Sequence, residues 1–137
     1  MLLINSEIPS IEDINTIIFD FDGIFTNNKV YIDQNGKETV VCSRSDGLAF
    51  DALKKLNKPI YIFSTEKNKV VSSRCKKLKI IAIQGIKNKK KELLKLVLKK
   101  RYNIKKIFYI GNDVNDYNAM KLCGLSACPK DSHKKIK

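Results

Sequence analysis

Carboxylates gather at a few positions of this chain, although acidic residues are scarce in it. Of the 14 acidic residues among 137, five fall in two short segments and at the exit of an expected hairpin: Asp20, Asp22, Asp46, Asp113 and Asp116. Carboxylates placed together repel one another unless a cation is bound, and hard oxygen ligands of this kind suit Mg²⁺. Magnesium between carboxylates and a phosphate recurs in phosphoryl transfer, so these residues indicate chemistry on a phosphate group.

Two further side chains suit the same chemistry. The hydroxyl of Ser64 can donate a hydrogen bond to a phosphate oxygen. The ammonium of Lys89 can neutralise charge on a nucleophile and on a transferring group. The fold must bring both groups to the carboxylates for this chemistry to occur.

The elements expected along the chain alternate between strands and helices. Short apolar runs predict strands over 16–19, 59–63, 80–83, 107–110 and 125–128. Helices are expected over 47–56 and 67–77, from Asn88 to about Arg101, and after residue 113 to about Leu122. The expected apolar face of the first helix comprises Leu48, Ala49, Ala52, Leu53 and Leu56, and that of the third comprises Leu93, Leu94, Val97 and Leu98.

A hairpin is expected between the first strand and the first helix. Two β-rich runs, 30–32 and 39–42, flank Asp33-Gln34-Asn35-Gly36, and Asn-Gly between such runs is a strong hairpin signal.

The alternation predicts an α/β fold with a parallel sheet covered on both faces. In such sheets the ligand sits beyond the carboxyl ends of the strands. Four expected strands end there in residues whose side chains can bind ligands or react: Asp20 and Asp22, Ser64 and Thr65, Gln84 with the downstream Lys89, and Asn112, Asp113 and Asp116. The sequence therefore predicts one site at this edge of the sheet.

Length and composition limit the class of protein. A chain of 137 residues fits a single domain over 1–137, and its hydrophobic fraction of 43% allows a real core. No apolar run approaches the roughly 20 residues of a membrane span. Residues 1–7 contain neither a basic stretch nor an adequate apolar run, so we expect no signal peptide there. We expect a soluble, cytoplasmic protein without a membrane partner.

The net charge of +13 comes from lysine, because only Arg44, Arg74 and Arg101 are arginines. The lysines are spread along the chain with local clusters at 87–91 and 134–137, which indicates a compositional bias more than a binding patch. Nucleic-acid sites usually rely on arginine, so we expect no nucleic-acid partner. The positive field would still speed the encounter with an anionic substrate.

The cysteines indicate reduced thiols. Cys42, Cys75, Cys123 and Cys128 form no C-x-x-C pair, and His133 is the only histidine, so a zinc site is not expected. Nothing in their spacing indicates an oxidising compartment, and we expect most of them to be buried.

Four segments together resemble one family. Asp20-Phe21-Asp22-Gly23-Ile24-Phe25-Thr26 is similar to the D-x-D-G-V-x-T first motif of the haloacid dehalogenase (HAD) superfamily. Ser64 matches the Ser/Thr of its second motif, and Lys89 the lysine of its third. Gly111-Asn112-Asp113-Val114-Asn115-Asp116 resembles the fourth motif, usually G-D-D-x-x-D. The order and spacing match across roughly residues 14 to 130, nearly the whole chain.

Within that superfamily, the short hairpin and the lack of a cap domain resemble the 3-deoxy-D-manno-octulosonate-8-phosphate (KDO-8-phosphate) phosphatases. The segments 42–47 and 64–68 look closest to a subgroup related to acylneuraminate cytidylyltransferases, often fused to or encoded beside that enzyme. The resemblance implies a three-layer Rossmann-like HAD fold with a protruding β-hairpin and no cap domain. It also implies a homotetramer whose hairpins pack together and help close neighbouring sites.

The resemblance also implies a role for each matched residue. Asp20 would be the nucleophile that forms an aspartyl phosphate, and Asp22 would be the acid and base, with a raised pKa. Lys89 would act with them, and Asp116 would hold Lys89 or a metal-bound water. The implied Mg²⁺ ligands are Asp20, the main-chain carbonyl of Asp22, and Asn112 or Asp113. The implied phosphate-binding residues are Ser64, Thr65 and Gly23, with Asp46 in a supporting role.

The sequence departs from the family pattern at three places. Asn112 stands where the metal-ligand Asp normally sits; its carbonyl can ligate Mg²⁺ but carries no charge, and the resembled subgroup often has G-N-D. Glu66 stands where these phosphatases often have Arg. Relatives continue with a Gly-Gly-Arg-Gly-like tail that can reach an active site, whereas the printed sequence ends at Lys137.

Structural explanations stand beside these roles. Asp20 and Asp22 could merely cap a turn, and Ser64 and Thr65 could be an ordinary helix N-cap. Lys89 could belong to a solvated lysine face. Asp113 could cap a helix with Asp116 in its first turn, and Asp46 could cap the helix at 47. Arg44 could have a structural role or a role in oligomerisation. His133 could be exposed and have no functional role.

Three functions compete at this point. The first is a Mg²⁺-dependent phosphatase of a phosphorylated acidic sugar, of the KDO-8-phosphate or nonulosonate-9-phosphate type, in lipopolysaccharide or sialic acid biosynthesis. The second is a catalytically weak oligomerisation module that supports an acylneuraminate cytidylyltransferase. The third is a basic nucleic-acid binder, whose affinity would fall steeply with salt. The retained motif residues favour the phosphatase.

Overall fold

A five-stranded parallel sheet forms the centre of the molecule, in the order β5-β4-β1-β6-β7. The computed structural model describes residues 10–137, so the expectation about a signal peptide over 1–7 lies outside the described residues. The strands are β1 (Thr16–Asp20), β4 (Ile60–Phe63), β5 (Ile81–Ile83), β6 (Ile107–Ile110) and β7 (Leu125–Ala127). All five expected strands are confirmed.

The central strand β1 pairs on both sides and is almost completely buried. Ile17 lies opposite Ile60 of β4 and opposite Phe108 of β6. A strand buried on both faces requires a continuous apolar sequence, and β1 supplies one from Ile17 to Phe19 before it ends at Asp20. The first residue with a charge on this strand therefore lies at its carboxyl end.

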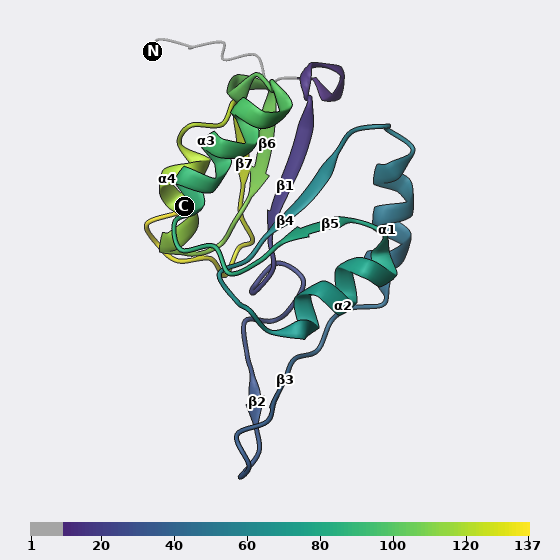
Figure 1. The fold of residues 1–137 in the computed structure, drawn as a ribbon, viewed down its shortest axis with the longest axis vertical. Helices are drawn as coiled ribbons and strands as arrows, with labels where there is room; N and C mark the ends of the chain where they lie inside the picture. Colours follow the sequence, from purple (N-terminus) through teal and green to yellow (C-terminus); the bar gives the residue numbers. More distant parts are fainter. Residues whose placement is uncertain (1–9) are drawn as a thin grey trace.

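Helices cover both faces of the sheet, as Figure 1 shows. They are α1 (Ser45–Lys54), α2 (Lys69–Leu78), α3 (Lys89–Lys100) and α4 (Val114–Met120), with short 3₁₀ turns at Ile11–Asp13 and Ile104–Lys106. Alternate residues of β4 face opposite layers: Tyr61 packs in the core with α3 and α4, whereas Ile62 packs in the core with α1 and α2. The expected three-layer α/β fold is confirmed.

The expected hairpin projects from the body of the molecule (Figure 1). Its strands are β2 (Tyr31–Ile32) and β3 (Glu38–Thr39), and the N–H of Gly36 donates to the carbonyl of Asp33 at 3.0 Å in the turn. The strands are shorter than expected, because 40–42 continues toward α1 without pairing. Within the described residues, the segment between β1 and α1 contains this hairpin and no larger cap domain.

The predicted apolar face of α1 is wrong for most of its members. The helix begins at Ser45, two residues earlier than expected, and Phe50 points into the core while Leu48 is 78% exposed. The ring of Phe50 packs against those of Phe19 and Phe25, with centroids 5.3 Å apart in both pairs. Burying this larger ring sets the rotation of the helix and turns the smaller apolar side chains outward.

The predicted apolar face of α3 is correct for Leu93 and Val97 only. Leu96 is buried in the core instead, whereas Leu94 is 40% and Leu98 80% exposed. Lys89, at the start of the helix, is buried on the same side as Leu93 and Leu96, at spacings of four and seven residues. The contacts of Lys89 thus help to set the face that α3 presents to the sheet.

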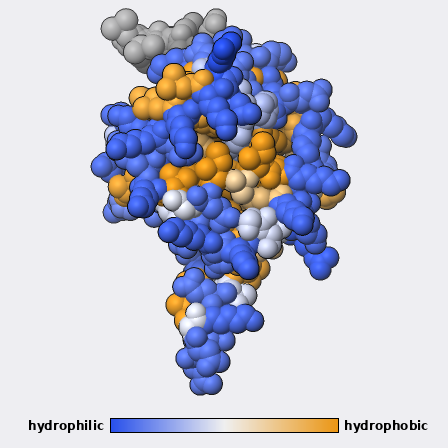
Figure 2. All heavy atoms as spheres, in the orientation of Figure 1, coloured by the Kyte–Doolittle hydropathy of each residue, from blue (hydrophilic) through white to orange (hydrophobic). Residues whose placement is uncertain are grey.

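The surface is mostly hydrophilic, with hydrophobic side chains on the body and on the hairpin in the view of Figure 2.

The thiols of Cys75 and Cys123 are buried, and those of Cys42 and Cys128 are half-buried; all are free. Among residues 10–137, none of the helices is both long enough and apolar enough to span a membrane.

Candidate active site

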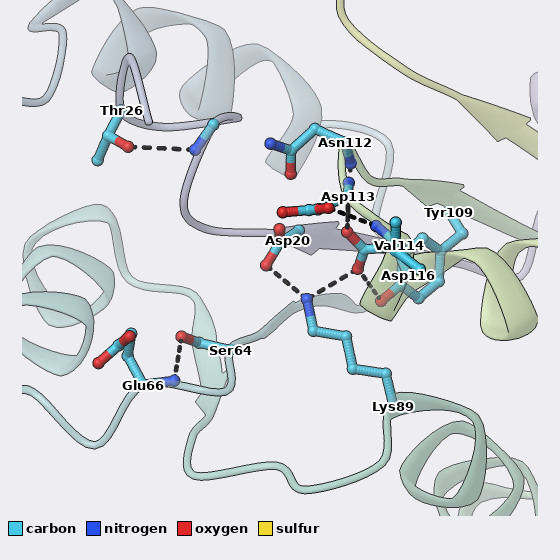
Figure 3. Close-up of polar contacts among 11 residues, drawn as sticks. Asp20, Thr26, Ser64, Glu66, Lys89, Tyr109, Asn112, Asp113, Val114 and Asp116 are labelled. Carbon is cyan, nitrogen blue, oxygen red and sulfur yellow. Dashed lines mark hydrogen bonds and ion pairs between the residues drawn. The ribbon is translucent and has the colours of Figure 1, made fainter. Parts of the chain in front are cut away.

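Polar residues from four segments meet at the carboxyl edge of the sheet (Figure 3). Asp20 ends β1, Ser64 follows β4, and Asn112 and its neighbours follow β6. Lys89 comes from the first turn of α3. The convergence expected from the strand order is therefore observed.

A buried ammonium joins two buried carboxylates. The Nζ atom of Lys89 donates to Oδ1 of Asp20 at 2.6 Å and to Oδ1 of Asp116 at 2.8 Å. Lys89 is 2% exposed, Asp20 6% and Asp116 0%. The alternative that Lys89 belongs to a solvated face is therefore wrong. A buried charge needs partners, and this lysine has two.

The carboxylate of Asp116 accepts four hydrogen bonds. Besides Lys89, the hydroxyl of Tyr109 donates to Oδ1 at 2.9 Å. The backbone N–H groups of Asn112 and Asp113 donate to Oδ2 at 3.2 and 3.3 Å. Asp116 thus connects the lysine to the loop that follows β6, and Tyr109 is a site residue that the sequence reasoning missed.

Asp113 occupies the position expected of a helix cap. Its Oδ1 accepts the N–H of Val114 at 2.6 Å, and with Asp116 it forms a capping box at the start of α4. The structural alternative for this pair is thus confirmed, although Asp116 also binds Lys89. Asp113 is exposed and lines the cavity described below.

Asn112 carries a buried oxygen that nothing satisfies among the described residues. Its Oδ1 has no hydrogen-bond partner there, whereas its backbone N–H binds Asp116 and its carbonyl accepts the N–H of His133 at 2.9 Å. A buried unpaired acceptor is costly unless a ligand completes it. The oxygens of Asn112 and Asp20 are of the type that Mg²⁺ prefers, so the residues present fit this ion.

The structure also limits how a metal could be held. Among residues 10–137, no three His, Cys, Asp or Glu side chains lie close enough to share an ion. Amide and main-chain carbonyl oxygens are the other hard donors that the chain offers beside a carboxylate at this edge.

Burial raises the pKa values of the two carboxyls that open the first motif. Desolvation raises the pKa of Asp20 to about 7, which Asp116 reinforces and Lys89 opposes. Desolvation, and secondarily the charge of Glu66, raises the pKa of Asp22. The predicted direction for Asp22 is confirmed.

The loop after β1 is organised by Thr26, the last residue of the first motif. Its hydroxyl oxygen accepts the N–H groups of Gly23 and Asn28, both at 3.1 Å. Thr26 is buried, and its side chain closes the turn that carries Asp22. Thr26 is thus a residue of the first motif whose structural role could not be assigned from the sequence.

Ser64 is buried at the end of β4, and its Oγ accepts the N–H of Glu66 at 3.1 Å. The hydroxyl hydrogen remains free to donate. The alternative that Ser64 and Thr65 cap a helix is wrong, because Asn68 caps α2 by accepting the N–H of Val70 at 2.9 Å.

A cavity of about 310 Å³ opens above Asp20, between the sheet edge and the base of the hairpin. Its lining includes Asp20, Asp22, Thr65, Glu66, Lys29, Glu38, Asp113 and Asn115. Its position leaves room for a ligand beside the first and fourth motifs.

Asp46 does not join the hydrogen-bonded cluster. It lies in the first turn of α1, and its Oδ2 is buried without a hydrogen-bond partner among the described residues. The helix begins before it, with Arg44 at the N-cap position, so the expectation that Asp46 caps a helix at 47 is wrong.

Comparison with known proteins identifies the family. The chain is 37% identical to a protein from Streptomyces avermitilis assigned to the HAD family hydrolases; the match covers 94% of this chain and 74% of that one, with a TM-score of 0.89. The chain belongs to the HAD superfamily. No protein-family model matches it.

Two further HAD relatives carry more specific names. The chain is 30% identical to the 3-deoxy-D-manno-octulosonate 8-phosphate phosphatase KdsC of Salmonella typhi, over 89% of this chain and 65% of that protein. It is 26% identical to the 3-deoxy-D-manno-octulosonate 8-phosphate phosphatase of Moraxella catarrhalis, whose structure contains a magnesium ion, a phosphate ion and KDO. That match covers 93% and 74% of the two chains, with a TM-score of 0.87.

The expected likeness to cytidylyltransferases is also found. The N-acylneuraminate cytidylyltransferase A of Danio rerio is 24% identical over 88% of this chain, but the match covers 29% of that larger protein. The first curated relatives are longer as well, since this HAD chain spans 65% of their length.

Proposed function

We propose that this protein is a Mg²⁺-dependent phosphomonoester hydrolase that works through an aspartyl phosphate on Asp20. The observation that carries the proposal is the buried pairing of Lys89 with Asp20 and Asp116 beneath a cavity. A lysine fixed against a carboxylate at the floor of a cavity suits a reaction in which negative charge gathers at that point.

In the first half-reaction, a carboxylate oxygen of Asp20 attacks the phosphorus of the substrate, and the bond from phosphorus to the sugar oxygen breaks. Asp22 lines the same cavity and donates its proton to the departing oxygen. The raised pKa of Asp22 keeps a larger fraction of this carboxyl protonated than an ordinary aspartate would have.

In the second half-reaction, Asp22 takes a proton from water, and the water oxygen attacks the phosphorus of the aspartyl phosphate. The bond from phosphorus to Asp20 breaks, which releases inorganic phosphate and restores the carboxylate. Lys89 faces Asp20 throughout and offsets charge on the nucleophile and the transferred group. Ser64 and Thr65 hold the phosphate oxygens, whereas the N–H of Gly23, the third expected phosphate-binding residue, donates to the hydroxyl of Thr26 in this structure.

The residues that would hold Mg²⁺ are Asp20, the main-chain carbonyl of Asp22 and Asn112, with Asp113 as the other candidate at the fourth motif. Bound there, the ion would supply electrostatic stabilisation of the charged phosphate. The unpaired oxygen of Asn112 supports this assignment.

The substrate class we propose is a phosphorylated acidic sugar, of the KDO-8-phosphate or nonulosonate-9-phosphate type. The names of the Salmonella and Moraxella relatives support the first, and the likeness to a cytidylyltransferase that uses an acylneuraminate supports the second. The net charge of +13 favours encounter with any such anion.

We also propose that the protein acts as a homo-oligomer, and a tetramer is the form that the family resemblance implies. Apolar side chains are exposed on the hairpin, where Tyr31 is 59% and Ile32 64% exposed, and on α1 at Leu48. A second copy would cover these side chains, and light scattering of the purified protein measures the assembly directly.

The test is phosphate release from a panel of phosphorylated sugar acids and neutral sugar phosphates, with and without Mg²⁺, beside Asp20→Asn. Asn115→Asp supplies a control at another cavity residue that has no assigned role. Metal-dependent release that Asp20→Asn abolishes supports the hydrolase. No release on any substrate, from folded protein, contradicts it.

A second function is favoured by Asn112 and by the likeness to a cytidylyltransferase. In that case the protein is a catalytically weak oligomerisation module that supports such an enzyme. It would assemble normally, release no phosphate, and raise the activity or stability of the cytidylyltransferase when the two are mixed.

A further inference from the structure

We propose that Tyr109 is a positioning residue of this site, whose hydroxyl fixes the carboxylate of Asp116 and thereby holds Lys89 against Asp20. The kinetic part of this inference rests on the proposed hydrolase function. The structural part, the placement of the Lys89 ammonium, stands without it.

The contacts converge on one oxygen atom. Oδ1 of Asp116 accepts both the hydroxyl of Tyr109 at 2.9 Å and the ammonium of Lys89 at 2.8 Å. Tyr109 and Asp116 are both 0% exposed, so water does not compete for these bonds. Burial, reinforced by the charge of Asp116, raises the pKa of Tyr109 well above its ordinary value, so the phenol remains a donor at working pH.

The two oxygens of Asp116 have separate tasks. Oδ2 takes the backbone N–H groups that lead into α4, whereas Oδ1 faces the lysine. The Oδ2 bonds are long, at 3.2 and 3.3 Å, so they hold the carboxylate less firmly than the shorter bond from Tyr109. The phenol therefore contributes strongly to the orientation of Oδ1.

Lys89 depends on that orientation. Its side chain is a flexible four-carbon stem, and its ammonium is directed by the acceptors it finds. Those acceptors are Asp20 at 2.6 Å and Asp116 at 2.8 Å. If the carboxylate of Asp116 turned, the ammonium would shift relative to the attacking oxygen of Asp20, and small displacements of catalytic groups lower rates strongly.

The chain contains a matched control for this tyrosine. Tyr61 and Tyr109 lie on either side of Ile18 at the same level of the sheet, and both belong to the same hydrophobic core. Tyr61 is 3% exposed, and its hydroxyl shares a hydrogen bond of 2.9 Å with that of Tyr102, which is not a site residue. Tyr61→Phe therefore removes a part-buried tyrosine hydroxyl from the same core without removing a bond to Asp116.

The kinetic experiment compares Tyr109→Phe with Tyr61→Phe on the best substrate of the panel. We expect Tyr109→Phe to lower kcat about tenfold with little change in KM, because the bond acts on the placement of Lys89 more than on substrate binding. Tyr61→Phe should leave both constants within about twofold. Phe fills the same volume, and thermal unfolding of the two variants checks that both fold.

The spectroscopic experiment observes the ammonium of Lys89 by nitrogen-15 NMR. A buried ammonium exchanges its protons slowly enough to give a signal, and loss of that signal in Lys89→Arg assigns it. We expect Tyr109→Phe to shift or broaden the Lys89 signal and Tyr61→Phe to leave it unchanged. In an Asp116→Ala background, Tyr109→Phe should have no further effect on the signal or on kcat, since the oxygen that Tyr109 and Lys89 share is removed.

The outcomes separate the two proposals. An unchanged Lys89 signal in Tyr109→Phe, or equal effects of the two Phe variants, overturns the positioning role. A wild-type protein without turnover contradicts the hydrolase function, while the Lys89 signal still decides the placement of the ammonium. A further loss of kcat on adding Tyr109→Phe to the Asp116→Ala background also overturns the inference, because Tyr109 would then act by another route.

Discussion

The side-chain amide of Asn112 lies directly against the α-carbon of Gly23. A Cβ atom at residue 23 would come within 1.9 Å of Nδ2 and 2.7 Å of Cγ of Asn112. Gly23 also has a φ of +90°, which side chains of L-residues rarely adopt. The first motif therefore makes room for the fourth, and the unpaired oxygen of Asn112 owes its position to the glycine.

Gly23→Ala should displace Asn112 and reduce metal-dependent turnover by about 100-fold, because the Cβ and the amide cannot share the space. Gly36→Ala is the matched control, since Gly36 has a φ of +76° and open space around it. That control carries only the conformational cost, about 1 kcal/mol of unfolding free energy. Phosphate release and thermal unfolding measure both variants. Equal turnover in the two would show that contact with Asn112 is unimportant.

Asn112→Asp should tighten Mg²⁺ binding by about tenfold, because a charged oxygen replaces a neutral one as a ligand of a divalent ion. Without metal, the same variant should be less stable than the parent, since the new carboxylate would be buried beside Asp116. Asn115→Asp adds the same charge at a residue that lines the cavity. Titration with Mn²⁺ by electron paramagnetic resonance gives the affinities, and an equal gain in both variants would argue that Asn112 is not a ligand.

The pH profile should report on Asp22. Burial first, and then the charge of Glu66, raise the pKa of this carboxyl, so its acid form persists to higher pH than usual. Since the acid form is the proton donor, kcat/KM should fall as pH rises through that pKa. Glu66→Gln removes one raising influence, so the alkaline limb should move to lower pH. Glu92→Gln, on α3, serves as the control; a limb that stays in place in Glu66→Gln refutes the assignment.

Ionisation of Asp20 should destabilise the folded protein as pH rises. Its folded pKa, about 7, lies above the ordinary value of 3.8, so the folded state disfavours the ionised form. This loss of unfolding free energy is absent below the ordinary pKa of Asp20 and grows until the pH exceeds the pKa of Asp20 in the folded state. Without metal, Asp20→Asn should therefore gain melting temperature relative to the parent between pH 4 and pH 8. The exposed Asp131→Asn controls for the loss of one charge, and a pH-independent difference for Asp20→Asn would contradict the expectation.

The position of the site could be predicted because it depends mainly on the order of strands and helices along the chain and on the spacing of the motifs. Parallel strands bring their carboxyl ends to one edge, so Asp20 and Ser64 had to meet once the alternation of strands and helices was recognised. The chain passes from β5 through a short loop into α3, so Lys89, the first residue of the helix, stays at that edge. Topology and motif spacing both constrain these positions.

Side-chain directions within elements were harder to predict. Tyr109 is one of four residues in β6, and the other three are apolar, so the sequence indicates a core strand. Its hydrogen-bond partner, Asp116, lies seven residues further along the chain, and nothing in the strand pattern indicates that bond. The alternation along β6 was the available signal, since it places Tyr109 on the side of Ile107, toward α3 and α4. In α1, the choice between Phe50 and Leu48 depended on the aromatic rings across the core, which periodicity does not reveal.

The rotation of α3 offers a direct test of how the site and the core are linked. Leu96 is 6% exposed on the same side of α3 as the site lysine, whereas Leu98 is 80% exposed, although periodicity favoured Leu98. Leu96→Ala should lower the free energy of unfolding by about 2–5 kcal/mol, because it leaves a cavity in the core. Leu98→Ala should change it by less than about 0.5 kcal/mol in the monomer. Urea unfolding measures both. A larger loss in Leu98→Ala would mean that α3 presents the other face to the sheet, and Lys89 could then not reach Asp20.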